Sequence, residues 1–395
     1  MKDVVLRLGL YYHIPATGRD GKIYLPGFFG RFVDSLAGQC QHLTCFFHTA
    51  SAADAALCDY PLSAPNVDWV DLGPARSAPY RTLFAGRFTR LIVPHLPKLD
   101  ALLLRGPSPL LPPIADAAVG RTPVALLLVG DYLAGVDSAA QPALRRMLIR
   151  LWAWWNTRGQ LRAVRRSLTV VNSRKLYDDL RPIAPHLFEV HTTTLSDDDF
   201  FERADTCQSA TMRLLYAGRL SAGKGLFDIV TAMSKLPHLD LHLDLVGWPE
   251  KGEPDIVAHL MAFAGERGLA GRVHNLGYKP LGPALFDCYH AADIFVLAST
   301  SDFEGFPRAI WEAMANSLPV VASRVGSIVY YAEGAAELFA PANPDGLAAA
   351  LERLIGQPAL RRERIRKGVS LARQNTLSAQ TEKLVAYICQ WVQNS

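Results

Sequence analysis

Residues 214–233, "LLYAGRLSAGKGLFDIVTAM", decide the fold. A short apolar run ends at Gly218, a loop of small and basic residues follows, and an amphipathic segment closes the stretch. This order is typical of a buried strand that turns through a glycine-containing loop into a helix. The stretch therefore predicts a βα unit of a parallel sheet, with its loop at the carboxyl edge of that sheet.

The same alternation of apolar run and helical segment occurs along most of the 395 residues. Runs that are apolar at consecutive positions indicate strands buried on both faces, as in a parallel sheet covered by helices. The clearest are "VVLRLGLYY", "LTCFFHT", "ALLLRG" and "VALLLVG" in the first half, and "MRLLYAG", "LHLDLVG", "IFVLAS" and "PVVASR" in the second. We therefore expect an α/β protein with two Rossmann-like, doubly wound parallel-sheet domains.

A polar segment separates the two halves. Residues 191–212 are rich in Ser, Thr and Asp and lack a regular apolar period, which places a linker near residue 200. The expected domains are residues 1–200 and residues 201–375. Residues 376–395 have apolar side chains at helical spacing, so they predict a terminal helix that could pack back on the N-terminal domain.

The composition limits the classes of function. A net charge of +4, with 20% charged and 50% hydrophobic residues, is typical of a globular protein with a large core and gives no indication of nucleic-acid binding. The six cysteines form no CxxC pair, so we expect reduced thiols rather than disulfides or a zinc site. No apolar stretch reaches the about 20 residues that span a bilayer, and the N-terminus differs from a signal peptide. The expected location is the cytoplasm, with at most peripheral contact with the inner face of the membrane.

The loop within residues 214–233 carries two candidate ligand-binding cations, Arg219 and Lys224. Loops at the carboxyl edge of an α/β sheet favour anions, because helix N-termini and backbone amides point there. A guanidinium and an ammonium in such a loop could together hold a diphosphate. The alternative is a pair of surface cations beside a flexible turn.

A second loop, within "STSDFEGFPRAIWEAM" (residues 299–314), follows a predicted strand. Its two acids, Glu304 and Glu312, would lie about 12 Å apart if both were helical. The carboxylates of a glycosidase pair are roughly 5–9.5 Å apart, so these two acids would contact different parts of one long ligand. The alternative is a carboxylate that offsets a helix dipole and an ordinary helix glutamate.

These segments, together with "LDLVG", "VHNLGY", "AAD" and "PVVAS", resemble in order the retaining glycosyltransferases of family 4, the group 1 glycosyl transferases of GT-B fold. The resemblance is dense over residues 213–355, whereas the N-terminal half matches only in layout. It implies a GT-B architecture, with two Rossmann-like domains facing a cleft. It also implies transfer of a hexose from a nucleotide-sugar donor to a glycan or lipid-linked acceptor, without a metal or other cofactor.

The resemblance also implies a donor site. Arg219 and Lys224 would clamp the diphosphate. Glu312 would accept hydrogen bonds from the ribose hydroxyls, and Glu304 would hold the sugar ring. The other implied donor-binding positions are Gly247 and Tyr278 near the nucleobase and the backbone amides of Gly305 and Phe306.

The implied chemistry places charge on the leaving group. Arg219, Lys224 and the helix dipole behind Glu304 would stabilise the departing diphosphate, an electrostatic role in catalysis. Retention would follow from front-face attack or from double displacement through a nucleophile, and the sequence leaves both routes open.

One departure from the family concerns a histidine that commonly follows the strand "VALLLVG". Gly130 and Asp131 stand there instead. Asp131 would keep a carboxylate near the reaction centre as a candidate catalytic group. His13, at the end of the first predicted strand, is a substitute if its loop folds inward, and is otherwise an ordinary loop histidine.

The segment "GKIYLPGFFGRFVDSLAG" (residues 21–38) resembles the acceptor-side loop and helix of the family. Gly27 and Gly30 would bring backbone amides close to the acceptor or the donor phosphate. The alternative is a pair of ordinary turn glycines.

Residues 145–166 contain seven arginines and three tryptophans interleaved with apolar residues. This composition favours a helix on an anionic membrane surface, with aromatic rings at the headgroup level. The alternative is a core-packed helix with a solvated basic face. If the membrane interpretation holds, the acceptor is lipid-linked, as in surface polysaccharide biosynthesis.

The sequence as a whole therefore predicts a retaining, metal-independent hexosyltransferase. Two alternatives stay open. One is a two-domain protein that binds a sugar or nucleotide-sugar without chemistry. The other is a degenerate partner subunit that binds donor without turnover, because the common histidine is missing.

Overall fold

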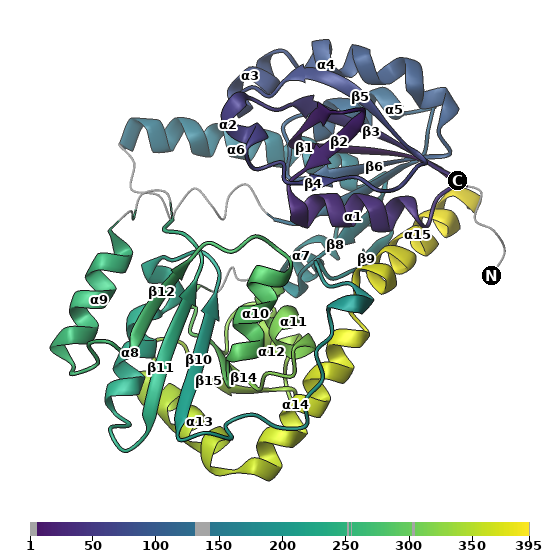
Figure 1. The fold of residues 1–395 in the computed structure, drawn as a ribbon. Helices are drawn as coiled ribbons and strands as arrows, with labels where there is room; N and C mark the ends of the chain where they lie inside the picture. Colours follow the sequence, from purple (N-terminus) through teal and green to yellow (C-terminus); the bar gives the residue numbers. More distant parts are fainter. Residues whose placement is uncertain (1–5, 131–142, 251–252, 254, 302–304, 395) are drawn as a thin grey trace. The chain divides into compact units, whose positions relative to one another are not determined.

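The computed structural model describes residues 6–130, 143–250, 253, 255–301 and 305–394 (Figure 1). The chain forms two compact units. The N-terminal unit comprises Met1–Thr192 and Leu377–Ser395, and the C-terminal unit comprises Thr193–Thr376.

The sheet of the N-terminal unit has nine strands within the described residues. They are β1 (Arg7–Arg19), β2 (Lys22–Leu25), β3 (His42–Thr49), β4 (Tyr60–Pro61), β5 (Val67–Pro74), β6 (Ala101–Gly106), β7 (Val124–Leu128), β8 (Leu168–Val171) and β9 (Leu187–Glu189). They lie in the order β4-β2-β1-β6-β7-β8-β9, with β3 beside β1 and β5 beside β3. All described pairs are parallel except β1–β2 and β2–β4. β6, β7 and β8 are buried along their whole length, which explains why their sequences are apolar without alternation.

Helices cover this sheet, and the last helix of the chain is one of them. They are α1 (Gly27–Ala37), α2 (Ala52–Ala55), α3 (Ala78–Leu83), α4 (Ala85–Ile92), the 3₁₀ helix η1 (Val93–Lys98), α5 (Leu111–Ala118), α6 (Ala143–Val164), α7 (Arg174–Leu180) and α15 (Leu377–Gln393). Figure 1 shows α15 beside α1, where the Ser35 and Thr381 hydroxyls are 2.8 Å apart. The Tyr387 ring also stacks on Phe188 of β9 at 4.0 Å. Residues from the chain's far end therefore complete the core of this unit.

The C-terminal unit has a six-stranded, fully parallel sheet within the described residues. Its strands are β10 (Thr211–Ala217), β11 (Asp240–Val246), β12 (Val273–Gly277), β13 (Ile294–Leu297), β14 (Val320–Ser323) and β15 (Ala336–Phe339). They lie in the order β12-β11-β10-β13-β14-β15. The direction of the strand order therefore reverses between β10 and β13, and ligands of open α/β sheets bind at such a switch point.

Helices of the C-terminal unit lie before, between and after its strands in the sequence. They are the 3₁₀ helices η2 (Asp197–Asp199) and η3 (Ala222–Lys224), and α8 (Leu226–Ser234), α9 (Ile256–Glu266), α10 (Pro283–Ala291), α11 (Arg308–Ala315), α12 (Ile328–Tyr331), α13 (Pro344–Gly356) and α14 (Pro358–Arg373). The aspartates of η2 stand where the sequence predicts a solvated linker. They are ordered because Ser196 and Asp199 form a capping box.

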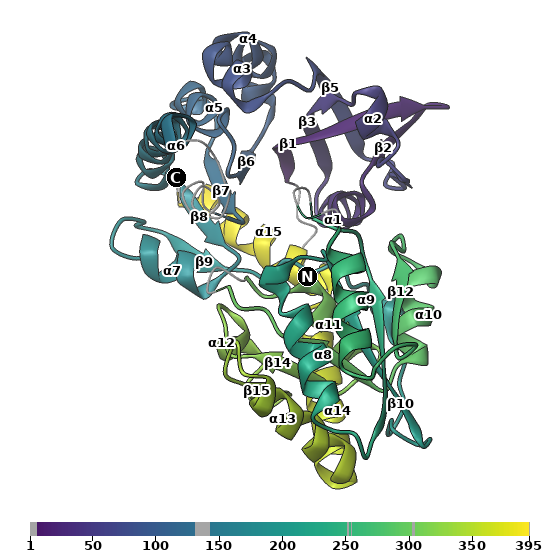
Figure 2. The same cartoon turned by 90° about the vertical axis from the view of Figure 1, so that its left-hand side faces the viewer.

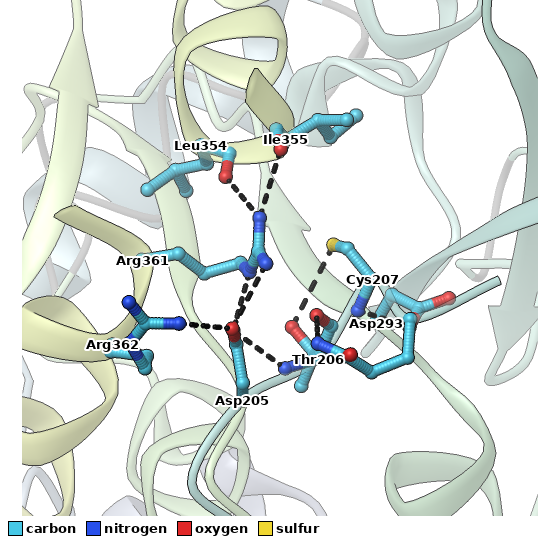
Figure 3. Close-up of polar contacts among 9 residues, drawn as sticks. Asp205, Thr206, Cys207, Asp293, Leu354, Ile355, Arg361 and Arg362 are labelled. Carbon is cyan, nitrogen blue, oxygen red and sulfur yellow. Dashed lines mark hydrogen bonds and ion pairs between the residues drawn. The ribbon is translucent and has the colours of Figure 1, made fainter. Parts of the chain in front are cut away.

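A buried ion pair fixes the segment that enters β10 (Figure 3). The Arg361 guanidinium, 2% exposed, donates to both carboxylate oxygens of Asp205 at 2.6 and 3.1 Å. It also donates to the carbonyls of Leu354 and Ile355 at 2.9 Å each. Burial alone would raise the pKa of Asp205, but its hydrogen bonds and the nearby Arg361 and Arg362 charges lower that pKa overall. A two-pronged arginine bond of this kind specifies geometry as well as contributing energy.

The aspartate of the "AAD" segment connects two neighbouring strands. Asp293, directly before β13, accepts hydrogen bonds from the Cys207 amide at 2.8 Å and the Arg213 amide at 2.9 Å. β10 and β13 are the two strands at the switch point. Asp293 thus fixes the start of one strand against the start of the other.

Candidate functional site

The loops after β10 and β13 are in direct backbone contact at the switch point. Gly225 adopts φ +67°, and a Cβ atom there would lie 2.0 Å from the carbonyl oxygen of Ala298. The amide of Thr300 donates to the carbonyl of Gly223 at 3.0 Å. Only glycine fits this close, left-handed approach. The two sequence motifs therefore meet at one edge of one sheet, as a shared binding site requires.

The neighbouring loop after β11 joins them. Gly247 has φ +149°, and a Cβ there would lie 1.8 Å from the carbonyl oxygen of Gly218. Leu220 donates its amide to the carbonyl of Trp248 at 2.8 Å. The resemblance places Gly247 near a nucleobase. The structure gives a separate reason for a glycine here, because a side chain would collide with the loop after β10.

Arg219 and Lys224 both lie in the loop after β10, as expected. The Arg219 side chain is about half exposed and is paired with Glu250 of the loop after β11. The backbone carbonyl of Arg219 accepts a hydrogen bond from the Tyr216 hydroxyl at 2.6 Å. Lys224 is half-buried at the end of η3, two residues before α8 begins. Glu250 is a partner that the sequence reasoning missed, because its contact depends on two loops meeting.

A carboxylate already uses one amide of this loop. The Ala222 amide donates to Glu253 at 2.8 Å. Backbone amides at such a loop are suited to anions. The loop thus binds anionic oxygen within the protein itself.

Glu312 lies in the second turn of α11 and is 8% exposed. One of its carboxylate oxygens accepts the Thr194 hydroxyl at 2.8 Å, and the other accepts the Tyr289 hydroxyl at 2.8 Å. Burial, together with the Glu312 charge, raises the pKa of Tyr289 well above its usual value. A carboxylate offers about four acceptor positions, so Glu312 has capacity for further donors beyond these internal ones.

The turn before α11 is held by an aromatic contact. Phe306 is 6% exposed, and its ring lies 4.1 Å from that of Trp311. Gly305, directly before it, has no atom within 4 Å of a Cβ position. The Phe306 side chain therefore packs in the core. We expect Phe306 to contact a sugar only through its backbone amide. Glu304, the acid expected to hold that sugar, lies outside the described residues.

Two exposed aromatic rings stand at the carboxyl ends of β11 and β12. Trp248 is 50% exposed and Tyr278 is 55% exposed, and their rings lie 5.0 Å apart at 76°. Exposed aromatic faces beside a ligand edge can stack on a planar base. The sequence reasoning selected Tyr278 and missed Trp248, although the tryptophan directly follows the glycine that ends "LDLVG".

His13 lies inside β1 rather than in a loop. The pairing of β1 with β3 is irregular between Tyr11 and Pro15, so His13 sits at a break in the ladder. Burial, followed by the charges of Arg81 and Arg105, lowers its pKa to about 4. His13 is therefore neutral near pH 7. Asp131, the other candidate catalytic group of the N-terminal half, lies outside the described residues.

Gly27 and Gly30 begin α1, and both amides have partners inside their own unit. The Gly27 amide donates to Asp59 at 2.9 Å. The Gly30 amide donates to the carbonyl of Pro26 at 2.9 Å, and a Cβ on Gly30 would lie 2.4 Å from the Tyr60 ring. Both amides therefore have partners inside the protein, and a ligand contact of these glycines stays a prediction.

The helix expected over residues 145–166 is α6 (Ala143–Val164). Figure 2 shows it beside α5, and its inward residues are small or polar, with Ala153 at 0% and Asn156 at 2% exposure. The large apolar side chains exposed on it by about half or more are Met147, Leu148, Leu151, Trp154 and Trp155. Arg150, Arg158 and Arg162 are exposed as well, so apolar and basic side chains share the solvent-facing part of this helix.

The described residues lack two further features. No group of three His, Cys, Asp or Glu side chains there is arranged to hold a metal ion. Among the helices of the same residues, none combines the length and apolar character needed to cross a membrane.

Residues 203–370 match the family described as "Glycosyl transferases group 1". The matched region contains the whole parallel sheet and both loops of the switch point. A D-inositol 3-phosphate glycosyltransferase of Corynebacterium diphtheriae is 29% identical over 180 residues, which are 44% of this chain and 41% of that protein. An uncharacterized glycosyltransferase of Methanocaldococcus jannaschii is 31% identical over 159 residues, 39% of this chain and 38% of that protein. The chain thus matches about two fifths of the length of these relatives.

Solved structures share the fold over nearly the full chain. Anabaena HepE in complex with UDP and glucose has a TM-score of 0.71 at 18% identity, covering 98% of this chain and 99% of that one. A sucrose-phosphate synthase from Thermosynechococcus elongatus has a TM-score of 0.70 at 16% identity, covering 99% and 100%. The predicted α/β fold with two parallel-sheet domains, the GT-B fold, is therefore confirmed.

Proposed function

We propose that this protein is a retaining glycosyltransferase that moves a hexose from a nucleotide-sugar to a sugar acceptor. One observation carries the proposal. The loops after β10 and β13, which bear Lys224 and lead to Glu312, are in backbone contact at the switch point of the C-terminal sheet. The group 1 match covers this region, and a protein of the same fold was solved with UDP and glucose.

The donor would lie across the carboxyl edge of the C-terminal sheet. Its diphosphate would bind Lys224 and Arg219. The Arg219–Glu250 pair is exposed, and exposed pairs contribute only about 0–1 kcal/mol, so a diphosphate can replace Glu250 at small cost. The base would stack on Trp248 or Tyr278, and the ribose hydroxyls would donate to Glu312.

The chemical step needs stabilisation of a leaving diphosphate. The two cations would supply it without a metal ion, since they lie in the loop where charge develops. Asp131 and Glu304 remain the proposed groups around the reacting sugar carbon. The missing histidine keeps the alternative of donor binding without turnover as an outcome of the test.

We further propose a lipid-linked glycan acceptor, as in surface polysaccharide biosynthesis, reached through α6. The helix Ala143–Val164 contains no acidic residue, and its exposed apolar side chains stand among arginines. Arg158, for example, lies over the Trp154 ring at 4.8 Å. An apolar stripe bordered by cations complements a bilayer with anionic headgroups.

The test is to follow donor cleavage by NMR with UDP-glucose and the corresponding GDP, ADP and TDP sugars. Water serves as the acceptor in the absence of the natural one. A retaining enzyme releases the α-anomer of the sugar first from an α-linked donor, and Lys224→Ala should lower the rate at least tenfold. The matched control is Lys235→Ala, a surface lysine of the same unit paired with Asp345. Release of the β-anomer first would contradict retention. Nucleotide binding without cleavage of any donor would support a non-catalytic protein.

A further inference from the structure

A group of basic side chains lies in the N-terminal unit, whereas the donor loops belong to the C-terminal unit. Three adjacent strands, β3, β1 and β6, contribute His48, His13 and Arg105. His48 and Arg105 are the next-to-last residues of their strands, and His13 lies two residues beyond the end of the β1–β6 pairing. α3 adds Arg81. The group is therefore at the carboxyl edge of this sheet, where open α/β folds bind ligands.

These groups are buried. His48 is 0% exposed, Arg105 8% and Arg81 9%. The Arg105 guanidinium lies over the rings of Tyr12, Phe29 and Phe32 at 4.8, 5.3 and 5.1 Å. The Arg81 guanidinium also faces the buried Tyr11 hydroxyl. Two guanidinium groups thus lie in the interior of one unit.

Polar atoms of this group lack partners within the described part of the chain. They are Nε of Arg81, Nε2 of His48 and Nδ1 of His13. The other His48 ring nitrogen, Nδ1, lies 3.3 Å from the carbonyl of Gly73. It donates to that carbonyl in the tautomer that has its proton on Nδ1. With a proton on Nδ1, Nε2 has a lone pair in the neutral ring and carries an N–H in the charged one.

The charges around the two histidines are mostly positive. His13 is acted on by Arg81, Arg105 and His48, and burial with these charges lowers its pKa to about 4. His48 is acted on by Arg81 and by one acid, Asp71, and burial is the main reason that its pKa is also about 4. Asp71 already accepts the Thr49 hydroxyl at 2.7 Å and the Gly73 amide at 2.8 Å. Two of its acceptor positions are therefore used by its own segment and β3.

We propose that Arg81, His48 and His13, with the charge of Arg105, form a binding site for the oxyanion of a ligand, a phosphate or carboxylate group. This inference rests on the proposed function. The oxyanion is then part of the acceptor, so the acceptor is an anionic sugar. An oxyanion accepts hydrogen bonds from Arg81 Nε and from the imidazoles once they are protonated. Binding therefore takes up protons and becomes tighter as the pH falls.

The experiment uses the full chain and sulfate, which stays doubly charged between pH 5.5 and 8. Sulfate is titrated at constant ionic strength against chloride, and the histidine ring nitrogens are followed by ¹⁵N NMR. Signals of His13 and His48 should shift with sulfate, and affinity should be at least threefold higher at pH 5.5 than at pH 7.5. Phosphate and acetate titrations at pH 6 then distinguish a phosphate ligand from a carboxylate ligand.

Arg81→Gln should weaken sulfate binding at least tenfold. Arg87→Gln, an exposed arginine on the adjoining α4, should leave it unchanged. Arg81→Gln removes a buried charge, so it should melt no lower than the parent, whereas a purely structural Arg81 would lower the melting temperature. Equal sulfate binding in the parent and Arg81→Gln, or no shift of either histidine, would overturn the proposal.

The two proposals fail separately. UDP binding should be the same in Arg81→Gln as in the parent, because the donor loops are in the other unit. Absence of cleavage of every nucleotide-sugar tested, with intact sulfate binding, would contradict the glycosyltransferase and leave the oxyanion site standing.

Discussion

At the scale of single residues, close backbone contacts determine the shape of the donor loops. Gly225 combines a left-handed conformation with a 2.0 Å approach of its Cβ position to Ala298. Gly223, two residues earlier, has no atom within 4 Å of its Cβ position. The same loop thus contains one glycine that the fold requires and one that it does not.

Gly225→Ala should therefore separate the two loops. The strain of a non-glycine residue in this conformation is about 1–3 kcal/mol, and the collision with Ala298 adds to it. We expect a melting temperature lower by several degrees and UDP binding weakened at least tenfold. Gly223→Ala is the matched control and should change neither. Thermal unfolding with and without UDP measures both, and parent-like binding in Gly225→Ala would refute the role of the contact.

Residues that the sequence did not reveal share one property. Arg81 and His48 approach His13 only because α3, β3 and β1 pack together, and Glu250 reaches Arg219 only because two loops meet. No local pattern encodes such contacts. Arg219, Lys224 and Glu312 were found because each lies in a short segment whose strand, loop and helix pattern is local.

At the scale of elements, the Asp205–Arg361 pair connects α14 to the segment that enters β10 (Figure 3). Asp205→Asn should leave the Arg361 charge buried without a counterion. Breaking a buried pair in this way costs about 3–5 kcal/mol. Chemical unfolding at pH 7 measures the loss, and Glu363→Gln, which breaks the exposed pair with Lys367, is the control expected to cost much less.

The same pair predicts a pH dependence. The pKa of Asp205 is lowered in the folded state, so its stabilisation is present above its unfolded pKa of about 3.9. It is lost as the pH falls through the lower, folded value. The parent should therefore lose more stability than Asp205→Asn between pH 5 and pH 3. Parallel curves for the two proteins would contradict the assignment.

α6 gives the third prediction at this scale. Replacing two exposed apolar side chains, Leu151→Gln with Trp155→Gln, should remove most binding to vesicles that contain phosphatidylglycerol. Leu57→Gln, a 65% exposed leucine of the same unit, should have no effect. Sedimentation with anionic and with neutral vesicles measures the binding. If the double variant bound anionic vesicles as well as the parent, or if the parent bound none, α6 would not be a membrane-binding surface.

At the scale of the whole molecule, the two-sheet α/β fold could be predicted from sequence. Fully buried strands such as β6, β7 and β13 are continuous apolar runs, and such runs need no alignment to be recognised. The strand order could not be predicted, because it depends on long-range pairing. η2 was missed since its capping box stabilises a polar segment that has no apolar period.

Local motifs predict where the donor loops lie in the fold but not which side chains they meet. The loops of Lys224 and Glu312 were placed correctly at one sheet edge. The sequence leaves Gly27 and Gly30 open between ligand contact and ordinary turns, and the structure adds that Asp59, Pro26 and Tyr60 contact them. A glycine that packs against a ring and one that approaches a phosphate look alike in sequence.

The central claim is that the switch-point loops of the C-terminal sheet hold a nucleoside diphosphate. Isothermal calorimetry with UDP, GDP, ADP and TDP, each compared with its monophosphate, tests this claim most directly. We predict that one diphosphate binds at least tenfold tighter than its monophosphate, and that Lys224→Ala removes this difference while Lys235→Ala keeps it. No binding of any diphosphate, or an unchanged preference in Lys224→Ala, would contradict the account.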